Sequence, residues 1–185
     1  MPDWFIEPFT SSNLPLIFIN TGGADIPDEP KIDAQMGIIY NGPNEINSLT
    51  DPFTDYNGDI GIEIRGSSSI LFEKKSFGFE TRLPDGENNN VSLLGMPEEN
   101  DWILNGPYSD KSLLRNVLSF HIGNSMGRYA PRTRWCEVFI NDQYVGVYVL
   151  MEKIKRDNNR VDIANVTPED ISGDELTGGY IFSVD

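Results

Sequence analysis

Two β-patterned stretches flank a loop of small residues whose chemistry suits phosphate binding. The first stretch and the loop read IGIEIRGSSS from Ile60 to Ser69, and the second stretch reads KKSFGFETR from Lys74 to Arg82. A Gly and Ser loop lets backbone N–H groups approach an anion closely, and a lysine on the next strand can reach the same phosphate. Ordinary β-hairpins also carry Gly and Ser at the turn and Lys at an edge. The pattern indicates a candidate nucleotide-binding site that comprises Arg65, Gly66, Ser67, Ser68, Lys74 and Lys75.

The alternation of side chains across a strand distinguishes the two lysines. Lys75 has the parity of Phe77 and Phe79, whereas Lys74 has the parity of Ser76. If the Phe face covers a helix, Lys75 points into the space between sheet and helix, and Lys74 is a solvated charge at the edge. The alternative for Lys75 is an aliphatic stem that packs over the core and leads its ammonium to solvent.

The sequence does not support a catalytic triad, a zinc site or a calcium loop. A Ser-His-Asp triad would need His121, the one histidine, which shares the apolar stripe of an expected helix. No His and Cys cluster could hold zinc, and the stretch from Asp55 to Asp59 lacks the Gly and Glu spacing of a calcium loop. Cys136 lies in the apolar pattern TRWCEVFI and is expected to be a buried, inert thiol.

Length and composition favour one folded, acidic unit. The chain has 185 residues, of which 38% are hydrophobic, so a packed core is expected. Its formal net charge of −15 argues against sequence-independent nucleic-acid binding and against docking on an anionic membrane face. Neither a signal peptide nor an apolar run of membrane length is visible in the sequence.

Apolar alternation predicts a chain rich in strands. Asn57-Gly58 is typical of a type I′ hairpin, and Asn141 to Gln143 is expected to join a second hairpin. A further strand is expected around Phe77 and Phe79. The remaining expected strands are Leu14–Asn20, Gly37–Tyr40, Gly61–Arg65, Trp102–Leu104, Thr133–Ile140 and Tyr144–Met151, with weaker candidates at Arg160–Val166 and Gly179–Val184.

One main helix is expected over about residues 110–126. Ser109 or Asp110 can cap its beginning, and Gly127 is a natural stop. A stripe with a period of 3.6 residues would form its apolar face: Leu113, Leu114, Val117, Leu118, His121 and Ile122.

Six further segments give the chain a family resemblance. They are IPDEPKI (26–32), MPEENDW (96–102), PYSDKSLLRN (107–116), YAPRTRW (129–135), GVYVLMEKIKRDNNRVDI (146–163) and LTGGYIFSVD (176–185). In this order and at these spacings they resemble the spore-coat protein H family, the CotH kinase-like proteins, from about Leu14 to the last residue. Residues 1–13 are then an amino-terminal extension, and residues 14–185 are the amino-terminal part of a CotH kinase-like domain.

The resemblance implies an α+β fold like the amino-terminal lobe of a protein kinase, with mostly antiparallel strands. It implies an atypical kinase that transfers the γ-phosphoryl group of ATP, with Mg or Mn, to Ser or Thr of a coat or surface protein. Glu152, at the end of VYVLME, resembles the hinge whose backbone meets adenine. One departure is that Lys111 to Arg128 contains no Asp or Glu to pair with a strand lysine.

The resembled family carries its catalytic motifs, Asn-x-Asp and Trp-Asp-Phe-Asp, after the GGY segment, and neither follows that segment in this chain; the one Asn-x-Asp, Asn57-Gly58-Asp59, lies far upstream of it. Both would follow the GGY segment, so the chain is expected to be truncated before them and inactive alone, and its partner would be the missing carboxy-terminal lobe. The resemblance implies a location in the spore coat or at the cell surface. Two alternatives are a non-catalytic coat or adhesion module on the same fold and an unrelated carbohydrate-binding domain.

Overall fold

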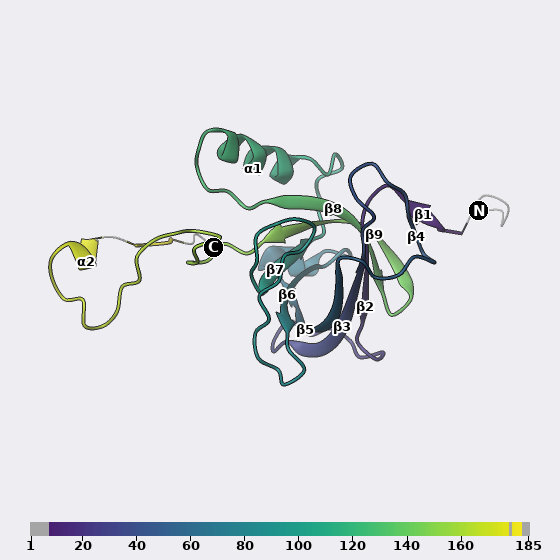
Figure 1. Ribbon diagram of the computed structural model, residues 1–185, viewed down its shortest axis with the longest axis horizontal. Helices are drawn as coiled ribbons and strands as arrows, with labels where there is room; N and C mark the ends of the chain where they lie inside the picture. Colours follow the sequence, from purple (N-terminus) through teal and green to yellow (C-terminus); the bar gives the residue numbers. More distant parts are fainter. Residues whose placement is uncertain (1–7, 178, 183–185) are drawn as a thin grey trace.

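Seven strands close into a β-barrel in the computed structural model, which describes residues 8–177 and 179–182 (Figure 1). The order around the barrel is β2-β3-β5-β6-β7-β9-β8. The bounds of these strands are β2 Leu16–Asn20, β3 Ile32–Ile39, β5 Tyr56–Arg65, β6 Ser76–Arg82, β7 Asp101–Asn105, β8 Thr133–Ile140 and β9 Gln143–Glu152. The smaller elements are β1 Ser11–Ser12, β4 Asn47–Ser48, the 3₁₀ turn η2 Ser68–Leu71, α1 Arg115–Ser125 and α2 Asp174–Thr177.

The barrel is antiparallel except where it closes. β2 pairs in parallel with β8, with Leu16 opposite Glu137 and Ile19 opposite Ile140. Closure leaves none of the seven strands with an unpaired edge, and unpaired edges are the usual liability of β-sheets. β5 and β6 form the hairpin that carries the candidate loop, and their last pair places Arg65 opposite Ser76. The expected strand–loop–strand arrangement of this region is therefore confirmed.

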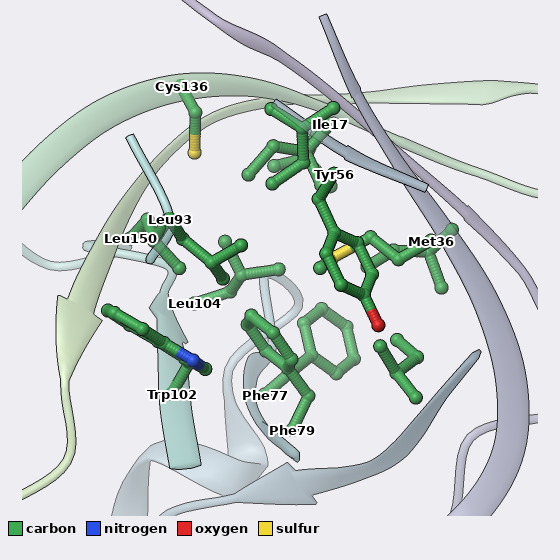
Figure 2. Packing of buried hydrophobic residues seen from close by; sticks show 14 of the residues in the cluster. Ile17, Met36, Tyr56, Phe77, Phe79, Leu93, Trp102, Leu104, Cys136 and Leu150 are labelled. Carbon is green, nitrogen blue, oxygen red and sulfur yellow. The ribbon is translucent and has the colours of Figure 1, made fainter. Parts of the chain in front are cut away.

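Alternating apolar residues from opposite walls fill the interior of the barrel. Figure 2 shows Phe77 and Phe79 of β6 pointing into the same interior as Trp102 and Leu150. Leu93 from the segment between β6 and β7 joins this core, as do Leu94 and Met96. Trp102 is fully buried, and its indole Nε1 donates to the backbone oxygen of Glu99 at 2.9 Å.

The expected α+β fold like a kinase lobe was wrong, because the strands bury their apolar faces against each other. The Phe face of β6 looks into the barrel and not toward a helix. Helix α1 lies outside the barrel beside β8 and β9 (Figure 1), where Val117 and Phe120 pack on the outward side chains of Ile103 and Val149. One helix of more than four residues is present among the described residues.

Helix α1 is shorter and more exposed than the sequence indicated. It begins at Arg115 because Leu113 has a φ of 58°, in the left-handed region, which interrupts helical geometry. Asp110 contributes to the cap, since its Oδ2 accepts from the backbone N–H of Arg115 at 2.9 Å. No residue of α1 is buried, so the predicted apolar stripe is not a core-facing surface. None of the described helices has the length and apolar character needed to cross a membrane.

Several strand predictions are confirmed and others are wrong. β2, β7, β8 and β9 fall within two residues of their expected bounds. Asn57-Gly58 lies inside β5 and forms no turn, whereas Asn141 and Asp142, with φ of 49° and 64°, make the turn between β8 and β9. Arg160–Val166 contains no strand, nor does Gly179–Phe182; the rest of Gly179–Val184 lies outside the described residues. The proposed domain boundary at residue 14 stays a prediction.

Candidate phosphate-binding site

The loop between β5 and β6 exposes the small residues that the sequence singled out. Arg65, Gly66, Ser67 and Ser68 are all exposed. Gly66 has a φ of 125°, and a Cβ at this position would collide with the hydroxyl of Ser69. The backbone conformation therefore favours glycine here, and any side chain would also force the Ser69 hydroxyl to move. The resulting turn presents main-chain groups to solvent without side-chain bulk in front of them.

Lys75 holds this loop together from its carboxy-terminal side. Its Nζ donates to the backbone oxygens of Ile70 and Phe72, each at 2.7 Å. An ammonium has three N–H donors, so these two bonds leave one donor for an anion. Lys75 therefore shapes the loop and also places a positive charge next to it.

Lys74 is not the solvated edge charge that strand parity predicted. Its Nζ lies 4.2 Å from the centre of the Tyr148 ring and donates to the backbone oxygen of Val145 at 3.1 Å. Two glycines make room for this side chain, because a Cβ on Gly146 would lie 2.9 Å from the Nζ and one on Gly106 3.1 Å from its Cγ. Desolvation lowers the pKa of Lys74 below its ordinary value, although the nearby thiol and carboxylate act in the opposite direction. The strand pattern failed here because β6 begins only at Ser76.

A second loop, which sequence reasoning did not assign to the site, packs against the first. The ring of Phe72 stacks on Tyr108 with a centroid distance of 5.2 Å. Lys111 places its Nζ 5.0 Å from the centre of the same Tyr108 ring. The signal available in the sequence was the segment PYSDK, but its contact with Phe72 is long-range and invisible to local pattern.

The cations near these two loops form no salt bridge, whereas most other lysines and arginines of the described residues do. Lys31, Arg82, Lys153 and Lys155 each form a salt bridge with a carboxylate. No carboxylate of the described residues lies within salt-bridge distance of a second group of cations, which comprises Arg65, Lys74, Lys75 and Lys111. Carboxylates still act on two of these cations from farther away, Glu63 on Arg65 and Glu137 on Lys74. Lys75 and Arg65 therefore flank the exposed loop without a direct carboxylate partner, and such groups attract anions.

Glu152 belongs to a different cluster, in which its own side chain and that of Arg160 are fully buried. Its carboxylate accepts from Nη1 of Arg160 at 2.9 Å, from Nη1 of Arg132 at 2.7 Å and from the Tyr129 hydroxyl at 3.3 Å. Burial, followed by the adjacent Glu152 charge, raises the pKa of the Tyr129 hydroxyl. The guanidinium of Arg160 also lies 4.8 Å from the Trp102 ring. This arrangement is a structural ion-pair cluster centred on Glu152, whose carboxylate accepts from all three neighbouring side chains.

The structure does not bring Glu152 together with the lysine loop. Glu152 is six residues beyond Gly146 on β9, which corresponds to about 20 Å at about 3.3 Å per strand residue. Its backbone N–H already donates to the backbone oxygen of Arg132 at 3.2 Å. Its contact with adenine stays a prediction.

Two further predictions from the sequence concern the Cys136 thiol and possible metal ligands. Cys136 is a free, fully buried thiol, as expected, and burial raises its pKa to about 12. Over the part of the chain that the structure describes, no group of three or more His, Cys, Asp or Glu side chains could hold a metal ion.

Comparison with known proteins agrees with the sequence resemblance. The CotH kinase protein family matches residues 62–185, a span that includes every candidate residue described above. Inner spore coat protein H of Bacillus subtilis (strain 168) is 32% identical over 96 residues. The aligned part covers 52% of this chain and 24% of that relative, so the chain corresponds to a minor part of the longer protein.

Proposed function

This chain belongs to the CotH kinase protein family, and on that basis we propose that it supplies the phosphate-binding part of an atypical protein kinase. The proposed reaction transfers the γ-phosphoryl group of ATP to Ser or Thr of a protein, and it belongs to the complete protein. The relative is an inner spore coat protein, so a coat protein is the proposed acceptor and the spore coat is the proposed location.

The observation that carries the proposal is the set of unpaired cations around an exposed glycine loop. Phosphoryl transfer depends mainly on positioning and on neutralising negative charge. Arg65, Lys75 and the main chain near Gly66 lie on one loop, and Lys75 itself bonds two carbonyls of that loop. This donor set suits a phosphate chain because it combines charge with backbone amides that can approach closely.

Mg or Mn is proposed to enter with ATP, because a divalent metal in a phosphate site is commonly held by one or two carboxylates together with phosphate oxygens. The family's metal aspartate belongs to the Trp-Asp-Phe-Asp motif, so its ligand is proposed to come from the rest of the complete protein. In this proposal Lys75 and Arg65 orient and partly neutralise the phosphates, and Lys75 also keeps the loop in its binding conformation.

The experiment compares phosphoryl transfer by the full-length protein and by these 185 residues. Each is incubated with ATP labelled at the γ-phosphate, with Mg or Mn and a Ser-rich protein acceptor. The full-length protein should label Ser or Thr of the acceptor, and the 185 residues alone should not, because neither family catalytic motif follows their GGY segment.

A matched pair of full-length variants identifies the contribution of this loop. Lys75→Ala should reduce labelling strongly, whereas Lys153→Ala, which removes an exposed lysine paired with Asp101, should not. If full-length protein binds no ATP and labels no acceptor, the family assignment remains but the kinase proposal fails, and a non-catalytic coat module becomes the better description. Robust transfer by the 185 residues alone would show that their own carboxylates perform the chemistry.

A further inference from the structure

A groove between helix α1 and strand β8 lies apart from the phosphate loop and is mostly apolar. Its volume is about 470 Å³. Leu114, Val117 and Leu118 line it from the helix side, and Pro131, Thr133 and Trp135 line it from the β8 side. Helix α1 itself lies outside the barrel, alongside β8 (Figure 1). A groove of this size and lining is typical of sites that accept apolar side chains of a ligand.

Three apolar residues at or next to this groove are poorly covered by the rest of the chain: Leu114, directly before α1, and Leu118 line it, and Ile122 lies one turn beyond Leu118. Leu114, Leu118 and Ile122 are 49%, 55% and 49% exposed. They are three or four residues apart, so they lie along one face of the helix. A contiguous exposed apolar face next to a groove is unusual on a monomer and marks an interaction surface.

The charge of the surrounding segment is opposite to that of the molecule as a whole. Residues 111–136 contain five basic residues and no Asp or Glu, whereas the remaining residues contain nine Lys and Arg against 29 Asp and Glu. The basic residues of this segment are Lys111, Arg115, Arg128, Arg132 and Arg134. The groove is therefore an apolar site with a basic surround on an otherwise acidic protein.

Two of these arginines are available to a partner. The Arg115 side chain is 80% exposed, and its one carboxylate contact is with Asp110 at 3.6 Å, a surface pair of small energy. Arg128 is exposed just beyond the end of α1. Arg132 and Arg134 are committed elsewhere, to Glu152 and to the backbone oxygen of Leu94. Arg115 and Arg128 thus place exposed positive charge at opposite ends of the helix, although Arg115 is weakly paired with Asp110.

We propose that this groove binds an acidic segment of a separate protein, one that inserts apolar side chains between α1 and β8. Leu114, Leu118 and Trp135 provide the apolar contacts, and Arg115 and Arg128 attract the carboxylates that flank them. Charge complementarity of this kind raises the association rate and disfavours basic partners. The same charges disfavour a basic segment in this groove. The site therefore selects a binding partner by the sign of its charge as well as by the fit of its apolar side chains.

Two synthetic peptides test the proposal on the 185-residue chain. Both carry Leu at helical spacing, and the other positions are Glu in one peptide and Lys in the other. Trp135 lines the groove, so its fluorescence reports binding, and Trp135→Phe identifies its signal. The Glu peptide should bind saturably, with an affinity that falls as salt is raised, and the Lys peptide should bind at least tenfold more weakly.

Matched variants distinguish peptide binding at the groove from nonspecific binding to other exposed apolar residues. Leu118→Glu and the double variant Arg115→Glu with Arg128→Glu should each weaken the Glu peptide at least tenfold. Ile46→Glu replaces an apolar residue of similar exposure, 58% against 55%, outside the groove and should leave binding unchanged. Because these residues are exposed, the variants should keep the thermal stability of the parent chain.

Five outcomes would overturn the proposal. They are absence of saturable binding, equal binding of the Glu and Lys peptides, and equal losses for Leu118→Glu and Ile46→Glu. The fourth is binding by the 185 residues but not by the full-length protein, which would show that another part of the same protein covers the groove. Sedimentation that detects a dimer abolished by Leu118→Glu would likewise identify a second copy as the occupant. None of these results bears on ATP binding at the separate phosphate loop.

Discussion

Nη1 of Arg160 lies 2.9 Å from Oε1 of Glu152, and both side chains are completely shielded from solvent. This ion pair joins the end of β9 to the segment that follows it. The guanidinium of Arg160 also lies against the face of the Trp102 ring. Nε and Nη2 of Arg160 have no hydrogen-bond partner, so the charge is held chiefly by Glu152 and the aromatic face. The sequence predicted that the backbone at Glu152 contacts adenine. In the structure, the Glu152 carboxylate neutralises a buried arginine.

Replacing Arg160 should therefore destabilise the fold severely. Arg160→Met keeps much of the apolar stem but leaves part of the Glu152 charge uncompensated, and breaking a buried pair costs about 3–5 kcal/mol. Urea unfolding measures the loss. Arg156→Met, an exposed position on the same segment, is the control and should change little. Similar midpoints for the two variants would mean that Arg132 alone compensates Glu152.

The free thiol offers a direct probe of the closed barrel. Cys136 is fully buried, and burial raises its pKa to about 12. Because the thiolate is the reactive form, Cys136 should resist a thiol reagent at neutral pH until urea unfolds the barrel. Fast labelling of the native protein would show that β8 opens readily or is not closed against β2.

Lys74 should give stability a specific dependence on pH. Its pKa is lowered in the folded protein from the ordinary value of 10.5, so the unfolded chain binds more protons between the folded pKa and 10.5. Stability should then rise with pH across that window, since the cost of a desolvated charge is relieved as the ammonium loses its proton. Lys74→Met should remove this part of the slope in unfolding measured at several pH values. An unchanged slope would mean that the ammonium is well solvated.

The conformation of Gly66 should matter more to nucleotide binding than the neighbouring hydroxyls. Gly66→Ala introduces a Cβ at a φ of 125° and against Ser69, which should distort the loop. Replacing Ser67 and Ser68 together by Gly removes both hydroxyls with their Cβ atoms but keeps the main-chain amides, so it should keep most of the ATP affinity in a calorimetric titration. A loss in the serine variant as large as that in Gly66→Ala would identify the hydroxyls as the phosphate contacts.

The local sequence pattern predicted the position of most barrel strands, but it did not predict that the strands close into a barrel. Thr133–Ile140 was predicted at its observed bounds because an uninterrupted run of β-forming residues ends at a turn of Asn141 and Asp142. The parallel contact of Leu16 with Glu137 joins residues more than a hundred positions apart, and no local period encodes it. Without that contact, the Phe face of β6 was expected to cover a helix.

The candidate site was predicted in part for the same reason. Gly66 and Lys75 were found from residue type and spacing, because a glycine turn beside a strand lysine is a local feature. Tyr108 and Lys111 were missed, since they join the loop only through the stacking of Phe72 on Tyr108. Lys74 was misplaced because its environment depends on Gly146 of a distant strand.

Calorimetric titration of ATP into Lys75→Ala and Lys74→Ala, each in the full-length protein, tests the central claim most directly. Lys75 bonds the loop itself, whereas Lys74 is turned toward Tyr148 and Val145. Lys75→Ala should therefore weaken ATP binding by about 1.5–3 kcal/mol, the range for hydrogen bonds to charged groups, and Lys74→Ala should weaken it less. Adenosine, which lacks phosphates, should not distinguish the two variants. Equal losses for ATP, or a larger loss at Lys74, would contradict the assignment of this loop as the phosphate site.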